Sequence, residues 1–290
     1  MIWTLIEIGL VSGLLSGLVY ALMSTGFNLS LGIARVVNLQ HGAAILWAMY
    51  ATFYGWHEWG INPFYLVPPL CVVAFAIGYA AQRFLIDRAL TVPEDSQILF
   101  SVGLLLSLQY LAQFTFTTDA HSVRAQALQG SIILGDLFLQ YKQIAAAALA
   151  LAVLLALRML LRYSDLGRDL KACAQNTIGA AACGLDTRRL YAVAMGISWV
   201  CAACAGVALA NLVPIVPDLA FQYAIMAVVV SVLGGLGSIV GSIVGGLIVG
   251  VVLGVSQALG YGPFAQALVY ACVFVVFLVS PSGLFGESLT

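Results

Sequence analysis

The sequence predicts an all-α polytopic membrane protein with eight or nine transmembrane or re-entrant helices. Of its 290 residues, 62% are hydrophobic and 8% are charged, which is too little polar surface to cover a soluble domain of this length. The mean hydropathy is +1.05. Uncharged apolar runs of about 20 residues recur along the chain, and each is long enough to cross a bilayer as a helix. The runs are continuously apolar rather than alternating, which excludes a transmembrane β-barrel.

Nine apolar runs account for the predicted membrane segments. In chain order they cover residues of about 8–32, 39–56, 62–82, 96–117, 143–161, 190–213, 221–235, 238–257 and 263–280. The run at 221–235 is short for a crossing and meets the next run at a glycine-rich break over 234–238. This pair therefore forms either two crossings or a re-entrant hairpin. We expect residues 1–290 to form a single membrane domain.

The basic residues predict the orientation of the chain. Nine of the eleven lysines and arginines fall in connections that lie on one side if every run crosses: Arg35, Arg83, Arg88, Arg158, Arg162, Arg168, Lys171, Arg188 and Arg189. Positive charge marks the cytoplasmic side of membrane proteins. We therefore expect the N-terminus outside and the C-terminus in the cytoplasm.

Glycines recur at four-residue spacing in two of the runs. Such rows give a smooth helix face that another helix can approach closely in lipid. The run at 238–257 carries two such rows, which suits the core of a bundle or a dimer interface. The predicted helix-packing positions are Gly13, Gly17, Gly234, Gly235, Gly237, Gly241 and Gly245.

The motifs of soluble and intramembrane enzymes are missing from the sequence. There is no H-E-x-x-H zinc motif and no Walker A motif, because Lys142 and Lys171 do not follow glycine. The six cysteines are scattered, and we interpret them as small apolar fillers rather than metal ligands or disulfides. Acidic residues avoid the centres of the runs, which disfavours a proton- or sodium-coupled carrier. We expect no catalytic residue, no metal and no nucleic-acid partner.

Asn38, Gln40 and His41 form a polar cluster at the start of the second run. One interpretation is that they cap the helix start and bond the neighbouring backbone. The other is that they line a path or gate for a small polar solute. The sequence leaves both open.

Residues 163–189 are rich in charged and amide side chains and lie between two apolar runs. Ser164 or Asp165 can cap a helix over about 166–175, Asn176 breaks it, and a second helix over about 177–183 ends at Gly184. Asp186 or Thr187 then caps the next run. An amphipathic helix lying on lipid would need large apolar side chains on one face, and few are present. The small residues of this segment (Ala172, Ala174 and 179–182) instead favour insertion into a protein groove.

Six motifs in order resemble the permeases of branched-chain amino acid ABC importers. They are Tyr20-Ala21-Leu22-x-x-x-Gly26, Asn38-x-x-His41-Gly42, Leu166-Gly167-Arg168-x-x-x-Ala172-x-Ala174-Gln175-Asn176, Ala181-x-x-Gly184, Leu233-Gly234-Gly235-Leu236-Gly237-Ser238 with Gly241, and Pro281-x-Gly283-Leu284-Phe285-Gly286. The match runs almost from end to end of the chain.

The resemblance implies a permease of the bacterial inner membrane that pairs with a second homologous membrane subunit. Two cytoplasmic ATPase subunits would bind ATP and Mg²⁺ and power it, and a periplasmic binding protein would deliver the solute. This chain itself would bind no cofactor. The segment 163–189 would couple to the ATPases through Asp165, Leu166, Gly167, Arg168, Ala172, Gln175, Asn176 and Gly184. Rigid-body motion would then open the path alternately to each side.

Three departures from the family pattern bear on the solute. Gln40 replaces a small apolar residue, residues 47–50 replace a Leu-Gly-Ala-Tyr stretch, and Ser280 replaces an arginine. Branched-chain or other amino acids are the first expectation, while related permeases carry urea, short amides or aromatic acids. A passive channel or an ion-coupled carrier for a neutral solute is the alternative from another class.

Overall fold

The computed structural model describes residues 2–89, 94–125, 128, 130–134 and 137–286. Its long helices are α1 (Ile2–Ala34), α2 (His41–Trp59), α3 (Val67–Ala81), α5 (Glu94–Phe116), α6 (Tyr141–Tyr163), α9 (Thr187–Ala210), α10 (Leu219–Gly234), α11 (Ile239–Ala258) and α12 (Ala265–Val279). Its short elements are the 3₁₀ helices η1 (Pro63–Leu66) and η4 (Gly262–Phe264), the π-helix η2 (Gln82–Ile86), α4 (Asp87–Ala89), the strands β1 (Ser131–Leu134) and β2 (Leu137–Gln140), α7 (Asp165–Gln175) and α8 (Thr177–Ala182).

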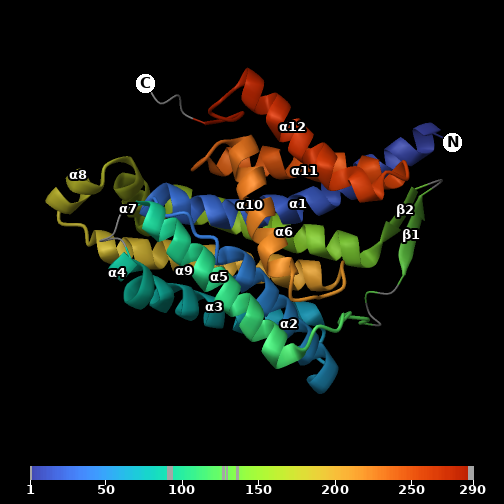
Figure 1. The fold of residues 1–290 in the computed structure, drawn as a ribbon, viewed down its shortest axis with the longest axis horizontal. Coiled ribbons are helices and arrows are strands. Elements are labelled where there is room, and N and C mark those ends of the chain that lie inside the picture. Colours follow the sequence, from blue (N-terminus) through green and yellow to red (C-terminus); the bar gives the residue numbers. More distant parts are fainter. Residues whose placement is uncertain (1, 90–93, 126–127, 129, 135–136, 287–290) are drawn as a thin grey trace.

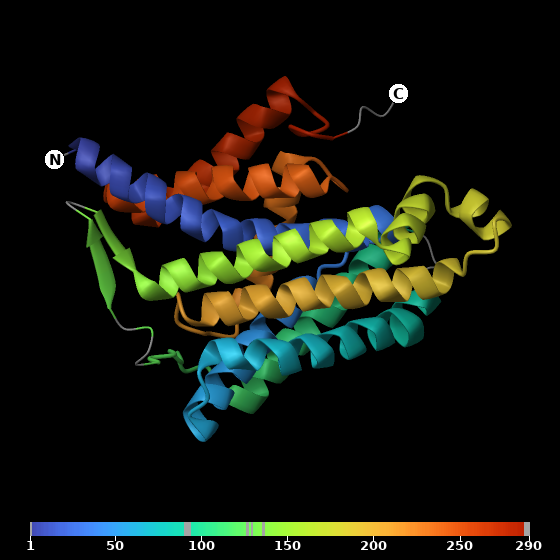
Figure 2. The same cartoon turned by 180° about the vertical axis from the view of Figure 1, so that it is seen from behind.

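The helices α1, α6, α9 and α11 run along the long axis of the molecule, and α10 crosses them steeply (Figure 1, Figure 2). The N-terminal end of α1 and the β-hairpin lie at one end, and α7 and α8 lie at the other (Figure 1). The predicted topology requires the N-terminus and the polar segment to lie at opposite ends. Which end faces the cytoplasm stays a prediction.

Within the described residues, seven helical stretches are long and apolar enough to cross a membrane. They are Ile2–Ala34, Pro63–Ile86, Ser96–Phe116, Tyr141–Tyr163, Thr187–Ala210, Ile239–Ala258 and Gly262–Val279. These correspond to seven of the nine predicted segments. The other two are also helical: α10 has only 16 residues, and α2 carries polar residues at both ends. The helical fold is confirmed at this level.

A short β-hairpin, in the part of the chain that the structure describes, departs from the all-helical prediction. β1 pairs antiparallel with β2, and Ser131 lies opposite Gln140. A second pairing precedes the hairpin in the same connection. His121 exchanges two backbone hydrogen bonds with Ile215. The His121–Ile215 pairing ties this connection to the residues that follow α9, and the hairpin lies at the end of the bundle that carries the N-terminus (Figure 1).

The glycine rows bring α11 close to two neighbouring helices. A Cβ atom at Gly13 would lie 2.6 Å from the Gly250 carbonyl oxygen, and one at Gly17 would lie 3.0 Å from that of Gly246. On the other face of α11, a Cβ at Gly245 would lie 2.6 Å from the Val230 carbonyl oxygen of α10. Both rows of α11 are therefore occupied by helices of the same chain, α1 on one side and α10 on the other.

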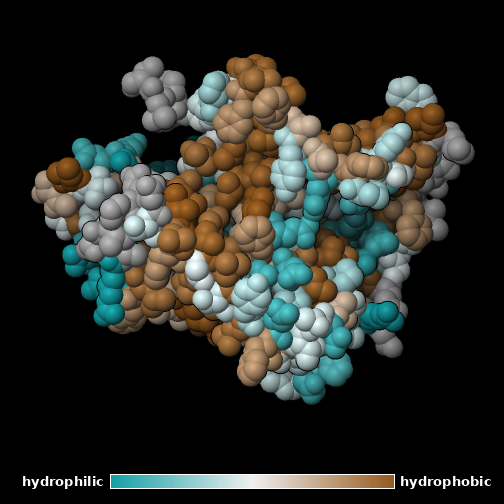
Figure 3. Space-filling model, viewed as in Figure 1, coloured by the Kyte–Doolittle hydropathy of each residue, from teal (hydrophilic) through white to brown (hydrophobic). Residues whose placement is uncertain are grey.

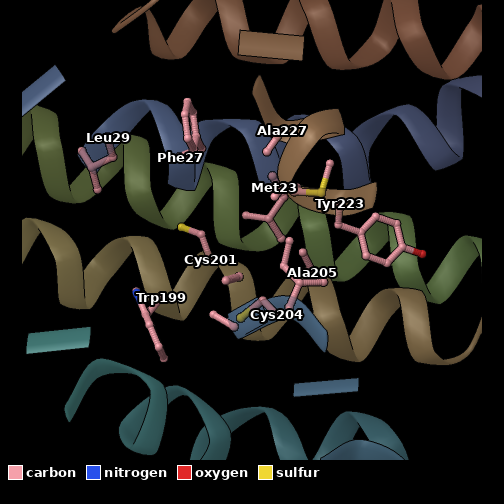
Figure 4. Close-up of a cluster of buried hydrophobic side chains, with 14 of the residues drawn as sticks. Met23, Phe27, Leu29, Trp199, Cys201, Cys204, Ala205, Tyr223 and Ala227 are labelled. Atoms are coloured by element: carbon pink, nitrogen blue, oxygen red, sulfur yellow. The ribbon is translucent and has the colours of Figure 1, made fainter. Parts of the chain in front are cut away.

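The helix α9 is the centre of the core, since most of its residues are buried. Met23 and Phe27 of α1, and Tyr223 and Ala227 of α10, belong to the same buried cluster as residues of α9 (Figure 4). Cys201 and Cys204 are both buried, and Cys204 Sγ lies 3.4 Å from Cys71 Sγ of α3. Their role in the fold is packing.

Candidate functional site

The polar segment 163–189 folds as two short helices with caps at each boundary. Ser164 Oγ accepts a hydrogen bond from the Gly167 amide at 3.0 Å and begins α7. Asn176 ends α7 and begins α8, and its Oδ1 accepts from the Gly179 amide at 2.9 Å. Gly184 follows α8 with φ +87°. The predicted helix–break–helix form is present, with caps where the sequence indicated them.

One face of α7 packs against the membrane domain. Gly167, Leu170 and Cys173 are buried, and a Cβ atom at Gly167 would lie 2.5 Å from the Leu160 carbonyl oxygen of α6. The Cys173 thiol contacts Thr177 and Tyr191, and burial raises its pKa above the ordinary value. Gly167, one of the predicted coupling residues, is the contact that lets α7 fold back closely onto α6, and its role in coupling stays a prediction.

The opposite face of the segment is open to solvent. Its exposed members among the predicted site residues are Asp165, Arg168, Ala172, Gln175, Asn176 and Gly184, while Leu166 is half-buried. Asp165 and Arg168 form an ion pair one helical turn apart, and both side chains are exposed, at 87% and 69%. Such a pair adds little stability. Its charges are therefore available to a partner.

The tip of the segment carries an exposed apolar side chain. Ile178 on α8 is 83% exposed. Ala181 and Ala182 are exposed beside it, whereas Ala180 is buried. α8 lies at the far end of the molecule (Figure 1), and Figure 3 shows hydrophilic side chains at that end, next to a hydrophobic band left of the centre of the face. The small-residue surface expected over 179–182 is thus interrupted by Ala180 and centred on Ile178.

His41 is fixed inside the bundle. Its Nε2 lies 3.0 Å from the Met23 carbonyl oxygen, and its Nδ1 lies 3.2 Å from Ser198 Oγ. Both ring nitrogens therefore have partners, on α1 and on α9. A Cβ atom at Gly26 would lie 2.9 Å from the His41 ring. His41 is a packed tie between three helices, which differs from a residue that lines a path.

Asn38 and Gln40 are buried without complete hydrogen bonding. Asn38 Nδ2 lies 2.9 Å from Met195 Sδ, but Asn38 Oδ1 and Gln40 Oε1 have no partner. Gln40 occupies the N-cap position of α2 and makes no side-chain cap bond. The capping interpretation therefore fails for Gln40. Both amides line a small cavity with Ser101, whose Oγ accepts from the Leu39 amide at 2.8 Å.

A third polar site, centred on Asn28, was not singled out from the sequence. Its Nδ2 donates to the Gly235 and Ser238 carbonyl oxygens and to Ser242 Oγ at 2.6 Å, and its Oδ1 accepts from the Gly237 amide. Ser24 and Ser231 hydroxyls meet one turn away at 2.8 Å. Asn28 therefore holds the break between α10 and α11. An asparagine eight residues from the motif residue Tyr20, inside an apolar run, was the only available signal.

The C-terminal motif closes the same break. The Leu284 and Phe285 amides donate to the Leu233 and Gly234 carbonyl oxygens, at 3.0 and 2.8 Å. Gly235 and Gly283 have positive φ and lie so close that a Cβ on Gly283 would be 2.7 Å from the Gly235 Cα. Three stretches that are distant in sequence thus meet at one junction.

Comparison with known proteins gives a match over nearly the whole chain. The family model for the permease component of branched-chain amino acid transport systems matches residues 9–280. The chain is 27% identical to the high-affinity branched-chain amino acid transport system permease protein LivH of Escherichia coli strain K12 and of Salmonella typhimurium, over 95% of this chain and 94% of each relative. It is 25% identical to the corresponding protein BraD of Pseudomonas aeruginosa, over 96% and 95%. No solved structure matches the chain.

Proposed function

Since the chain belongs to the permease family of branched-chain amino acid transport systems, we propose that it forms half of the membrane path of an ATP-driven importer. The other half is a second homologous membrane subunit. A permease component of this family is a transport subunit rather than an ATPase. ATP and Mg²⁺ belong to two partner ATPase subunits in the cytoplasm, and a periplasmic binding protein delivers the solute. The chain lies in the bacterial inner membrane, with its N-terminus outside.

The segment 163–189 is the coupling element in this proposal. The observation that carries the proposal is the exposed tip of this segment, where Ile178 is 83% exposed on a capped helix that projects from the bundle. An exposed isoleucine flanked by alanines is suited to a groove in another protein, because small neighbours let the two surfaces approach closely. Arg168 and Asp165 supply charge at the rim of the same surface. Movement of the ATPases would be transmitted through Leu170 and Gly167 to α6.

The solute is proposed to be a branched-chain or other amino acid. The named relatives are permeases of high-affinity branched-chain amino acid transport systems, and their likeness to this chain covers 95–96% of it. At 25–27% identity the family is shared, while the individual solute is a proposal. Asn38 and Gln40 are the residues to which we assign contact with the path, and His41 positions them from the next residue.

Charge reversal at Arg168 tests the coupling role. In the complex purified through the permease, Arg168→Glu should reduce co-purified ATPase at least tenfold, because the exposed guanidinium would become a carboxylate next to Asp165. The amount of inserted permease and its unfolding temperature should not change. Lys142→Glu, a charge reversal on the same chain at the far end of α6, is the matched control. Normal ATPase recovery with Arg168→Glu would refute the role of this surface.

A further inference from the structure

Two hollows on the side of the bundle formed by η2 and α5 share a single side chain. A small cavity of about 10 Å³ is lined by Val36, Asn38, Gln40, Ile86, Gln97, Phe100 and Ser101. A groove of about 700 Å³ is lined by Phe84, Leu85, Arg88, Ser96, Phe100, Gly103, Leu104 and Ser107. Phe100 lines both, and it is partly exposed, at 39%. It therefore forms a wall between the groove and the cavity.

Two residues of the cavity lining carry hydrogen-bond acceptors that the described part of the chain does not use. Asn38 and Gln40 are each 1% exposed, and the side-chain oxygen of each lacks a partner. A buried carbonyl oxygen that lacks a donor destabilises the fold, because it has lost its hydrogen bonds to water. Two such oxygens belong to residues that line one small cavity, and a bound donor would remove their cost. A cavity of about 10 Å³ has room for about one water molecule.

A stretch of π-helix contributes to the lining of both hollows. Phe84 and Leu85 of η2 line the groove, and Ile86 of the same turn lines the cavity. Gln82, the first residue of η2, is fully buried and its Oε1 also has no partner. A π-helical turn is a wider form of helix that is frequent at functional sites. The groove and the cavity are thus separated by the Phe100 side chain and by η2. A change of rotamer or a small shift of this helix would connect them.

We propose that the cavity is a subsite of the solute path and that the Phe100 side chain gates access to it. The cavity receives the nitrogen end of the solute. This rests on the proposed function as a permease. The ammonium group of an amino acid and the NH₂ group of an amide share the chemistry that two carbonyl oxygens recognise, since both present N–H donors. A carboxylate has no donor for Asn38 Oδ1 or Gln40 Oε1, and these oxygens disfavour it at this position.

The gating role of Phe100 is tested by the reactivity of a cysteine placed in the cavity. Ile86→Cys puts a thiol in the cavity wall without changing either amide, and labelling by the cationic reagent methanethiosulfonate ethylammonium is located by peptide mass. In the full-length permease within the reconstituted importer, adding Phe100→Ala should accelerate labelling at least tenfold. Phe114→Ala, on the same helix and outside both hollows, is the matched control. Equal labelling rates with and without the Phe100 side chain would overturn its gating role.

The subsite is tested by protection of the same cysteine in the Phe100→Ala background. L-leucine or isobutyramide should slow labelling at least threefold, and 4-methylpentanoate, which lacks nitrogen, should not. The stronger protector of the first two distinguishes an ammonium ligand from an amide ligand. Gln40→Met should abolish protection, as should Asn38→Leu, whereas Gln109→Met on α5 should leave it intact. Equal protection by the acid, or no protection by any compound, would overturn the subsite and leave a water pocket only.

These results separate the subsite from the proposed function. An importer that recovers its ATPases and imports solute but shows no protection refutes the subsite alone. Protection in a permease that neither binds an ATPase nor imports solute refutes the importer and retains the subsite.

Discussion

The α1–α11 contact and the segment 163–189 are both rich in glycine and alanine, yet they use small side chains in opposite ways. Along α1 and α11, glycine is required because the other helix occupies the space where a side chain would be. In α8 and the residues after it, Ala181, Ala182 and Gly184 are exposed, and nothing lies within 4 Å of a Cβ placed on Gly184. Small residues therefore seal one region and leave the other open to a partner. Composition alone does not distinguish the two uses; the surrounding space does.

The largest expected effect is at the sealed contact. Gly250→Ala places a methyl group against the Gly13 carbonyl oxygen and the Gly17 backbone, with no flexible side chain to move aside. We expect a loss of about 2–3 kcal/mol in the free energy of unfolding, the upper part of the range for overpacked cores. Thermal unfolding of the purified permease measures it.

Gly103→Ala is the control for that change. Gly103 lies within α5, and a Cβ atom there would meet nothing within 4 Å. Alanine is the better helix former, so this variant should be as stable as the wild type or more stable, by up to about 1 kcal/mol. Equal destabilisation by the two variants would show that the close approach of α1 and α11 is not the cause.

The next effect concerns the junction beside the sealed contact. Asn28→Leu removes hydrogen bonds to three acceptors and leaves the Gly237 amide without its partner. We expect a loss of about 2 kcal/mol or more. Asn211→Leu, which removes one hydrogen bond to the Val207 carbonyl oxygen within α9, should cost about 1 kcal/mol or less. The same unfolding measurement compares them, and a reversed order would contradict the junction's role.

At the open region, stability and association should respond differently. Ile178→Ser should change the free energy of unfolding by no more than about 0.5 kcal/mol, because the side chain is 83% exposed. It should reduce ATPase recovery at least tenfold if the tip enters a groove. Val279→Ser on α12, also 83% exposed, should change neither quantity. ATPase recovery that is unaffected by Ile178→Ser would mean that the open surface has another use.

The smallest perturbation is chemical labelling of the native cysteines. Cys183 is exposed after α8, whereas Cys173 is buried in α7. Burial raises the pKa of the Cys173 thiol, so less of the reactive thiolate is present near neutral pH. N-ethylmaleimide should therefore modify Cys183 at least tenfold faster than Cys173, as followed by peptide mass. Bound ATPase should slow the Cys183 reaction. Faster labelling of Cys173 would show that α7 separates from α6 in solution.

Features that depend on local chemistry were predictable from the sequence. Ser164, Asn176 and Gly184 mark the boundaries of α7 and α8, because capping involves residues at most a few positions apart. The apolar runs identified the membrane segments for the same reason. Helix boundaries in this segment agree to within about one residue, which is the uncertainty of boundary assignment itself.

Features that depend on distant contacts were not predictable. Gly167 belongs to a motif of the polar segment, and only the backbone of α6 shows that it is buried. Asn28 gains its role from residues more than 200 positions later. The hairpin over 131–140 is short, and strands of this length carry too little pattern to recognise inside an apolar chain.

The order in which the chain is synthesised gives the junction at Gly235 a further consequence. Leu284 and Phe285 supply the donors for the carbonyl oxygens at the end of α10, and they are synthesised after both α10 and α11. Until then, the Leu233 and Gly234 carbonyl oxygens lack these partners in a setting where unpaired backbone groups are costly. Closure of the junction is therefore a late step of assembly. A chain that stops before Gly283 would present an unfinished helix end, which quality-control proteases of the membrane could recognise.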